Sequence, residues 1–179
     1  MHLNNFEVFH FINSFELNYI SKLDKKINLI YRNYEKPINF KLLIDLRNYC
    51  KSNNIKLYFS NNIKIAKKYN LDGVYIPSFN KKMIISNKNL KKNFKILGSA
   101  HNIKEIRQKE MQNVEYIFYS PIFKNKGNNK KVYIYNLSKI IKLSNSKIVA
   151  LGGINNNNNI KKLKLVNCKR FAYISNIIN

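Results

Sequence analysis

The chain has 179 residues, of which 45% are apolar and 23% are charged, and this balance predicts a compact globular protein and excludes an intrinsically disordered one. Its apolar stretches all fall short of the roughly 20 residues that a membrane-spanning helix needs, so we expect no membrane partner. The formal net charge is +24, from 33 basic and 9 acidic residues, and it favours encounters with anionic ligands.

The basic excess has two interpretations. Clustered Lys and Arg would bind the phosphates of a nucleic acid. Here the basic residues are spread along the whole chain, and only the segment "KNKGNNKK" (residues 124–131) concentrates charge in one predicted loop. We therefore favour a general inflation of Lys, Asn and Ile by codon bias, and nucleic-acid binding remains the less favoured alternative.

Short apolar runs rich in β-branched and aromatic residues alternate along the chain with segments that have helical spacing. In one of these segments Leu42, Leu43, Leu46 and Tyr49 form a single apolar stripe. The predicted strands, in chain order, are residues 6–12, 27–31, 56–59, 73–76, 95–98, 115–119, 147–151 and 170–174. The predicted helices are residues 14–23, 39–51, 62–69, 103–112, 135–143 and 157–166.

Alternation of short, almost wholly apolar strands with helices predicts parallel βα units. Eight such units predict a closed (β/α)₈ barrel, formed by residues 1–179 as a single domain, and a doubly wound open sheet is the alternative. Because this fold usually needs at least about 200 residues, we expect short connections and one missing helix.

Two cysteines, Cys50 and Cys168, lie far apart and have no neighbours at metal-ligand spacing. They predict reduced thiols in a cytoplasmic protein rather than a disulfide or a zinc site.

The chain has only five glycines, yet Gly152 and Gly153 are adjacent and directly follow the predicted strand 147–151. Such a pair predicts either a phosphate-binding turn or an ordinary strand-to-helix turn.

Seven motifs, taken in order, carry a more specific signal than any of them alone. They are "LIYRNYEK", "LYFSNN", "DGVYIP", "LGSAHN", "YIFYSPIFKNK", "IVALGGIN" and "FAYISNI", which together run from about residue 27 to residue 177. In order and spacing they resemble the thiamine-phosphate synthase and thiazole-tautomerase superfamily. The chain is closer to the synthase, because Pro121 stands where the tautomerase branch has its catalytic histidine.

The resemblance implies a (β/α)₈ barrel that joins an aminopyrimidine pyrophosphate to a thiazole phosphate and releases pyrophosphate. Arg32 and Ser99 correspond to catalytic, pyrophosphate-binding positions, and Ser60 falls on another substrate-binding position. Further substrate contacts are implied for Asn125 and Lys126 in the basic loop. The phosphate of the second substrate is implied to bind at Gly152, Gly153, Ile174 and Ser175.

The resemblance also implies a magnesium ion, but here the sequence departs from the family. The family aspartates that bind the metal are replaced by Asn61 and Asn80, and an amide oxygen is a weaker ligand than a carboxylate. We therefore predict a divergent thiamine-phosphate synthase. The alternatives are a catalytically decayed relative that binds a phosphorylated ligand and, less favoured, a nucleic-acid-binding protein. The sequence leaves the oligomeric state open.

Overall fold

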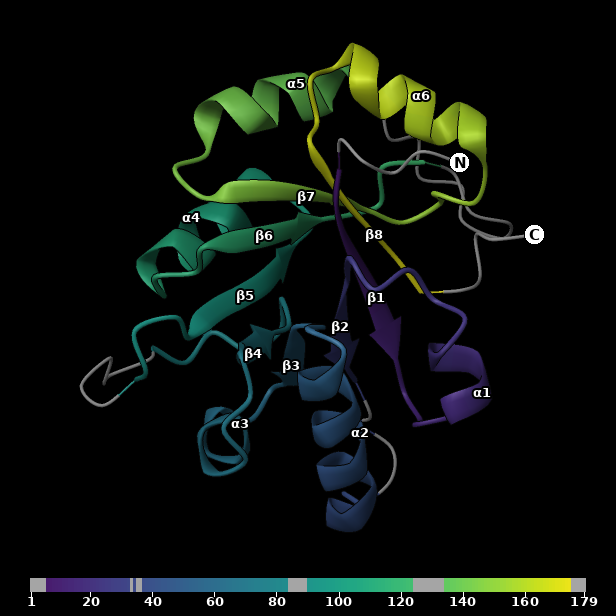
Figure 1. Ribbon diagram of the computed structural model, residues 1–179. Helices are drawn as coiled ribbons and strands as arrows, with labels where there is room; N and C mark the ends of the chain where they lie inside the picture. The colour runs from purple at the N-terminus through teal and green to yellow at the C-terminus, as the bar shows by residue number, and fades with distance from the viewer. Residues whose placement is uncertain (1–5, 33, 35–36, 84–89, 124–133, 175–179) are drawn as a thin grey trace.

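Eight parallel strands close into a barrel in which each strand pairs with its neighbours in the sequence and β1 pairs with β8 (Figure 1). The structure is a computed structural model that describes residues 6–32, 34, 37–83, 90–123 and 134–174. The predicted (β/α)₈ barrel is confirmed, and the doubly wound alternative is wrong. The strands are β1 (Glu7–Ile12), β2 (Ile27–Tyr31), β3 (Leu57–Ser60), β4 (Gly73–Ile76), β5 (Lys95–Ala100), β6 (Tyr116–Tyr119), β7 (Lys147–Leu151) and β8 (Arg170–Tyr173).

Six helices in the described part of the chain lie outside the barrel (Figure 1). They are α1 (Leu17–Ile20), α2 (Phe40–Ser52), α3 (Ile63–Lys68), α4 (Ile103–Met111), α5 (Ile134–Leu143) and α6 (Asn157–Leu165). The predicted helix 14–23 is much shorter than expected. Its N-cap residue, Glu16, makes no side-chain capping bond, and after Ser21 the backbone continues only as turns. Residues 77–83 and 90–94, between β4 and β5, contain no helix, as expected for a short barrel.

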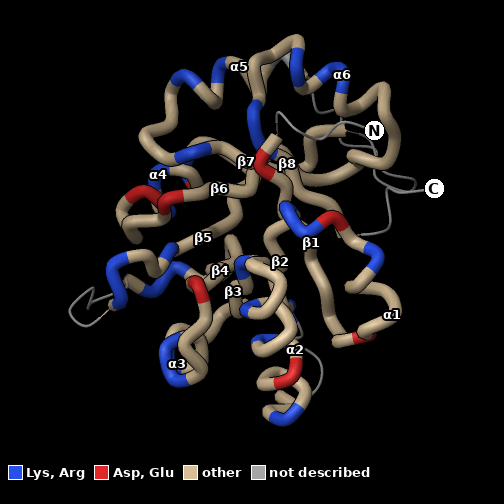
Figure 2. The backbone as a smooth tube through the Cα atoms, in the orientation of Figure 1, with Lys and Arg blue, Asp and Glu red and all other residues tan. Residues whose placement is uncertain are grey.

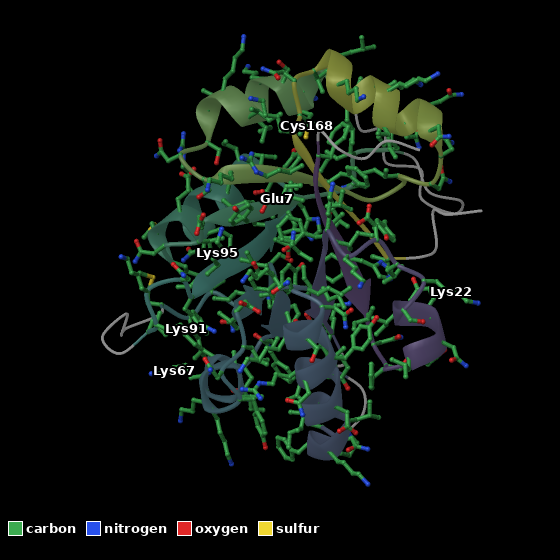
Figure 3. The ribbon with its side chains drawn as sticks, in the orientation of Figure 1. Glu7, Lys22, Lys67, Lys91, Lys95 and Cys168 are labelled. Atoms are coloured by element: carbon green, nitrogen blue, oxygen red, sulfur yellow. The ribbon has the colours of Figure 1, made fainter. Side chains whose placement is uncertain are left out.

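Successive residues of each strand point alternately into the barrel and out toward the helices. On β1, for example, Phe9 and Phe11 point inward, whereas Val8 and Ile12 pack under the outer layer. The inward set is rich in aromatic rings, so the barrel interior is a packed core and not a channel. Side chains of strands and helices also fill the space between the barrel and the surrounding helices (Figure 3).

Asparagine side chains fix where several helices begin. Asn39, Asn62, Asn102 and Asn156 are the N-caps of α2, α3, α4 and α6, and each side chain accepts a hydrogen bond from the backbone N–H three residues later. Because each of these helices follows the carboxyl end of a strand, the caps place four helix N-termini around that end of the barrel.

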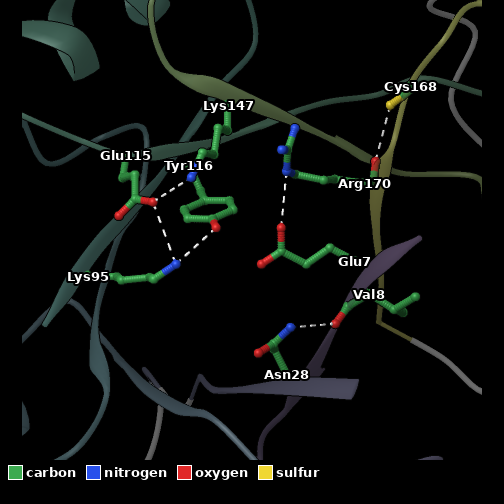
Figure 4. Close-up of polar contacts among 9 residues, drawn as sticks. All are labelled: Glu7, Val8, Asn28, Lys95, Glu115, Tyr116, Lys147, Cys168 and Arg170. Carbon is green, nitrogen blue, oxygen red and sulfur yellow. Dashed lines mark hydrogen bonds and ion pairs between the residues drawn. The ribbon is translucent and has the colours of Figure 1, made fainter. Parts of the chain in front are cut away.

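Ion pairs lie at the amino end of the barrel, on the first residues of β1, β5, β7 and β8 and on Glu115 just before β6 (Figure 4). Arg170 donates to Glu7 over 3.0 Å, and Glu115 lies 2.8 Å from the Lys147 ammonium and 3.5 Å from that of Lys95. These three cations also lie 4.7 to 5.8 Å from the centre of the Tyr116 ring. Each of these three cations has a carboxylate partner within the cluster, and the opposite, carboxyl end remains as the candidate site.

Candidate functional site

The predicted site residues that the structure describes gather at the carboxyl end of the barrel. Arg32, Asn61 and Gly152 follow β2, β3 and β7 directly, and Ser99 is the penultimate residue of β5. Since all eight strands are parallel, the carboxyl ends of all of them face the same way. Ser60, Asn80, Gly153 and Ile174 lie at or just beyond strand ends on the same side. Asn125, Lys126 and Ser175 lie outside the described residues.

Arg32 lies above the packed interior. Its backbone N–H donates to the Ile12 carbonyl over 2.7 Å, which continues the β1–β2 pairing by one residue. Its guanidinium carbon is 5.1 Å from the centre of the inward-pointing Phe11 ring. The side chain therefore holds a permanent positive charge at the mouth of the barrel, where an anion can approach.

Ser60 is buried at the end of β3, and its hydroxyl lies 2.7 Å from the hydroxyl of Tyr34. The Tyr34 ring in turn meets the exposed Phe79 ring edge to face, with the centroids 6.0 Å apart. Burial raises the pKa of Tyr34, although the Ser60 hydrogen bond and the charge of Arg32 act in the opposite direction. Tyr34 is therefore a neutral phenol at physiological pH, and it connects the β2 and β3 sides of the rim.

Ser99 is buried and points inward at the end of β5. Its hydroxyl oxygen accepts a hydrogen bond of 2.9 Å from the Ser78 backbone N–H and also bonds to the Tyr75 hydroxyl. Burial raises the pKa of Tyr75, while Ser99 and Arg32 oppose this shift. Ser99 thus positions the backbone that follows β4, and its predicted role toward pyrophosphate remains a prediction.

Asn61 and Asn80, the positions where the resemblance implies metal-binding aspartates, face each other. The Asn80 amide nitrogen donates to the Asn61 side-chain oxygen over 2.7 Å, and the Asn80 side-chain oxygen accepts from the Lys82 backbone N–H over 3.0 Å. Both amide oxygens are therefore already acceptors. Among the described residues no three His, Cys, Asp or Glu side chains are grouped closely enough to hold a metal ion. This donor set does not fit magnesium.

Gly152 and Gly153 both have left-handed backbone conformations, with φ of 90° and 69°. A Cβ on Gly153 would lie 2.5 Å from the Phe123 carbonyl oxygen, and one on Gly152 would lie 3.1 Å from the Cα of Pro121. The backbone N–H of Phe123 also donates to the Gly152 carbonyl over 3.1 Å. The tight turn and the close approach of the segment after β6 explain both glycines structurally. The predicted binding of a phosphate at this turn stays a prediction.

Lys109 and Gln112 of the α4 region are site residues that the sequence analysis missed. The Lys109 side chain is completely buried, and its ammonium donates to the carbonyls of Pro77 and Asn80 over 2.8 Å each. Burial lowers the pKa of Lys109 to about 8, so the side chain is still mostly charged at neutral pH. A charged residue three positions after Ile106, on the buried face of the helix, was the available signal.

The cationic surface is not confined to the rim. Lys and Arg lie on α2, α3, α5 and α6, on several sides of the barrel (Figure 2). This agrees with the even spread of basic residues along the sequence. Within the described residues, no helix combines the length and the apolar character needed to span a bilayer.

These features define a (β/α)₈ barrel, a class of protein in which ligand sites lie at the carboxyl ends of the strands. The family model described as thiamine monophosphate synthase matches residues 25–177. The chain therefore belongs to the thiamine monophosphate synthase family, as the order of motifs predicted.

Curated relatives agree with this assignment. A thiamine-phosphate synthase of Clostridium tetani is 32% identical over 125 residues, which cover 68% of this chain and 59% of the relative. One of Prochlorococcus marinus is 41% identical over 87 residues, which cover 47% of this chain and 25% of the relative. In these matches the chain thus spans about a quarter to three fifths of the relatives' length.

Solved structures support the fold. A thiamine phosphate pyrophosphorylase from Pyrococcus furiosus superposes with a TM-score of 0.70 at 17% identity, covering 97% of this chain and 87% of that one. An HpcH/HpaI aldolase from Desulfitobacterium hafniense reaches 0.67 at 9% identity, with coverage of 97% and 87%. Since an aldolase matches almost as well, these likenesses describe the barrel and do not by themselves indicate its chemistry.

Proposed function

We propose that the protein is a single-domain transferase that makes thiamine phosphate from 4-amino-5-hydroxymethyl-2-methylpyrimidine pyrophosphate and thiazole phosphate. The bond between the pyrimidine methylene carbon and the pyrophosphate oxygen breaks, and its electron pair leaves with pyrophosphate. The thiazole nitrogen supplies the electron pair of the new carbon–nitrogen bond. This exchange requires no proton transfer at carbon, so the protein acts by orienting the two substrates and by stabilising the negative charge that develops on the leaving group.

The observation that carries this proposal is the Arg32 guanidinium at the mouth of the barrel, 5.1 Å from the Phe11 ring and on the same rim as Ser60 and Ser99. A planar guanidinium can bind two pyrophosphate oxygens at once. The two serine hydroxyls, at the ends of β3 and β5 with β4 between them, supply neutral hydrogen-bonding groups on the same rim. We assign Arg32 the main role in stabilising the leaving pyrophosphate.

The phosphate of the thiazole substrate would bind at the turn formed by Gly152 and Gly153. β7 pairs with β8 through Leu151 and Ala172, and two residues further along each strand stand Gly153 and Ile174. The backbone N–H groups of such a turn are suited to an oxyanion. We propose that Ser175, Asn125 and Lys126 complete the contacts to the substrates.

Magnesium, which the family implies, has no part in the steps above, because the Asn61–Asn80 pair does not supply its ligands.

The compartment is proposed to be the cytoplasm. The described part of the chain contains Cys50 and Cys168 as buried free thiols, and free thiols are usual in a reducing compartment.

The test is to incubate the purified protein with both substrates and to measure thiamine phosphate by chromatography and pyrophosphate by a coupled assay. We expect both products in equal amounts from the wild type and a loss of most activity in Arg32→Met. Arg47→Met is the matched control, since the Arg47 guanidinium on α2 bonds only to the neighbouring Asn48 side chain among the contacts described. No product above a protein-free blank, with or without added magnesium, would reject the proposal.

A second candidate is a decayed relative that binds a phosphorylated ligand without turning it over. The specific observation in its favour is the replacement of both family aspartates by the bonded pair Asn61 and Asn80. Calorimetric binding of thiazole phosphate in the absence of any product would identify this case.

A further inference from the structure

We propose that the buried Lys109 ammonium and the Asn61–Asn80 pair hold the segment after β4, residues 77–83 (here the β4 loop), at the rim. In this arrangement they take the place of a divalent cation. The rim would then bind pyrophosphate independently of magnesium. The identity of the ligand rests on the proposed function. The fixing of the loop rests on contacts within the chain alone.

The β4 loop is fixed by one hydrogen bond from its backbone to the barrel and by two hydrogen bonds within the loop. The Ser78 N–H donates to the Ser99 hydroxyl over 2.9 Å, and the Asn80 N–H donates back to the Pro77 carbonyl over 3.1 Å. The Lys82 N–H donates to the Asn80 side-chain oxygen over 3.0 Å. The loop therefore has a defined path over the end of β5, and Asn80 lies at its centre.

Lys109 provides a fixed cation beneath this loop. Its Nζ lies 2.8 Å from the Pro77 carbonyl, 2.8 Å from the Asn80 carbonyl and 2.9 Å from the side-chain oxygen of Gln112. These three oxygens satisfy all three N–H donors of the ammonium. A buried charge that is fully hydrogen-bonded binds its partners firmly, because losing any one of them would leave it unpaired in a medium of low polarity.

Gln112 extends the same network. With its oxygen accepting from Lys109, its amide nitrogen donates to the Asn80 carbonyl over 3.1 Å and to the Lys82 carbonyl over 2.7 Å. The Asn80 carbonyl thus receives hydrogen bonds from two buried side chains of the α4 region. Such convergence on one backbone position is what a positioning device requires.

The orientation of the asparagine pair follows from this arrangement. The Lys82 N–H can bond only to an oxygen, so the side-chain oxygen of Asn80 must face it, and the Asn80 nitrogen must face Asn61. The Asn61 oxygen is thereby fixed as an acceptor. A magnesium ion prefers charged carboxylate oxygens, whereas this pair offers only neutral amide oxygens, each of which already accepts one hydrogen bond.

Hydrogen exchange of the β4 loop tests the positioning role of Lys109. In Lys109→Met, which keeps the unbranched apolar stem but removes the ammonium group, we expect the amides of Ser78, Asn80 and Lys82 to exchange at least about tenfold faster. Lys104→Met on the exposed side of α4 is the matched control and should leave them unchanged. Equal loop exchange in Lys109→Met and wild type would overturn the proposal. If Lys109→Met does not fold, Gln112→Met provides the same comparison.

Two measurements test the independence from magnesium. Loop exchange in the wild type should be the same in EDTA as in magnesium, and slower exchange in magnesium would overturn the proposal. Calorimetric titration with inorganic pyrophosphate should give dissociation constants in EDTA and in magnesium that agree to within about tenfold. Abolition of this binding by EDTA would also overturn it.

The double variant Asn61→Asp, Asn80→Asp is the converse test, because its carboxylates should repel pyrophosphate in EDTA and regain binding when magnesium is added. An unchanged response of this variant to magnesium would contradict the assignment of these positions. If pyrophosphate binds under none of these conditions, the proposed function and the magnesium-independent binding fail together, whereas the exchange data still decide whether Lys109 fixes the loop.

Discussion

The hydroxyl of Tyr34 lies 2.7 Å from that of Ser60 and joins the segment after β2 to the end of β3. Tyr34 is half exposed, so this bond contributes more to the shape of the rim than to the stability of the barrel. We expect Tyr34→Phe to lower kcat/KM for the pyrimidine pyrophosphate by about fivefold, the value of one neutral hydrogen bond, with the melting temperature nearly unchanged.

Steady-state kinetics and thermal unfolding of the same preparation check this prediction. Tyr69→Phe is the matched control, because its ring stacks on Phe40 of α2 and lies among the helices. A large fall in melting temperature in Tyr34→Phe would show that the bond supports the fold instead of the site.

Arg32 allows a test that separates charge from geometry. Arg32→Lys keeps the positive charge but loses the planar fork, so we expect the dissociation constant for pyrophosphate to rise about tenfold. Arg32→Met loses both and should bind more weakly still. Calorimetry with inorganic pyrophosphate measures both variants, and Arg47→Lys serves as the control. Equal affinity in Arg32→Lys and wild type would show that Arg32 acts only through its charge.

The barrel could be predicted because a parallel strand that is buried on both faces appears in the sequence as a short continuous apolar run. Helical segments show a different pattern, with apolar residues spaced three or four positions apart. Runs such as residues 73–76 and 147–151 became β4 and β7 with unchanged bounds. The helix at 14–23 was overestimated, because its helical spacing says nothing about capping, and Glu16 provides no side-chain cap. The spacing of apolar residues therefore predicted the positions of helices and strands better than it predicted where they begin and end.

The location of several candidate residues at strand ends could be predicted from motifs, and their roles stay predictions. Arg32, Ser60 and Ser99 follow from such motifs, and parallel strands bring them to one rim. The helical spacing could have shown that Lys109 is buried, but not which groups it contacts, because its partners Pro77 and Asn80 are 32 and 29 residues away in the sequence and belong to a loop without periodicity. Contacts of this kind depend on the packing of α4 against the barrel, which no local pattern encodes.

His10 predicts a loss of stability in acid. Its Nδ1 lies 3.1 Å from the Tyr173 carbonyl, which can only accept, so Nδ1 carries the proton and Nε2 accepts from the Tyr19 hydroxyl over 2.6 Å. Burial lowers the pKa of His10 to about 4 from an ordinary value of 6.5, while the Tyr173 carbonyl acts in the opposite direction. Protonation would remove the acceptor that Tyr19 uses.

Between these two pKa values the unfolded chain binds a proton that the folded protein does not. The contribution of His10 to the free energy of unfolding is therefore complete above pH 6.5 and is lost as the pH falls toward 4. The total loss is at most about 3 kcal/mol. Urea unfolding across this range should show a shallower pH dependence in His10→Gln than in the wild type. His101→Gln, at an exposed position, is the matched control for replacing a histidine by glutamine. Equal slopes in His10→Gln and wild type would contradict the prediction.

Asparagine also ends several helices. Asn54, Asn70, Asn113 and Asn167 follow α2, α3, α4 and α6 with φ between 51° and 57°, a left-handed conformation that glycine more often supplies. At the end of α6 the N–H of Asn167 donates to the Lys164 carbonyl, and the N–H of Cys168 donates to that of Leu163. A chain with only five glycines thus uses asparagine, which tolerates this conformation better than most residues.

Asn167→Ala should therefore destabilise the protein by about 1 kcal/mol, because a Cβ without a compensating polar group is strained in this conformation. Asn167→Gly should be neutral or slightly stabilising. Asn48→Ala, in the interior of α2, is the matched control and should not destabilise, since alanine is the better helix former there. Thermal unfolding of the three variants measures these differences as shifts in Tm of a few degrees, on the order of 2–4 °C per kcal/mol. Equal stability of Asn167→Ala and Asn167→Gly would show that the left-handed turn is not what selects asparagine at the end of α6.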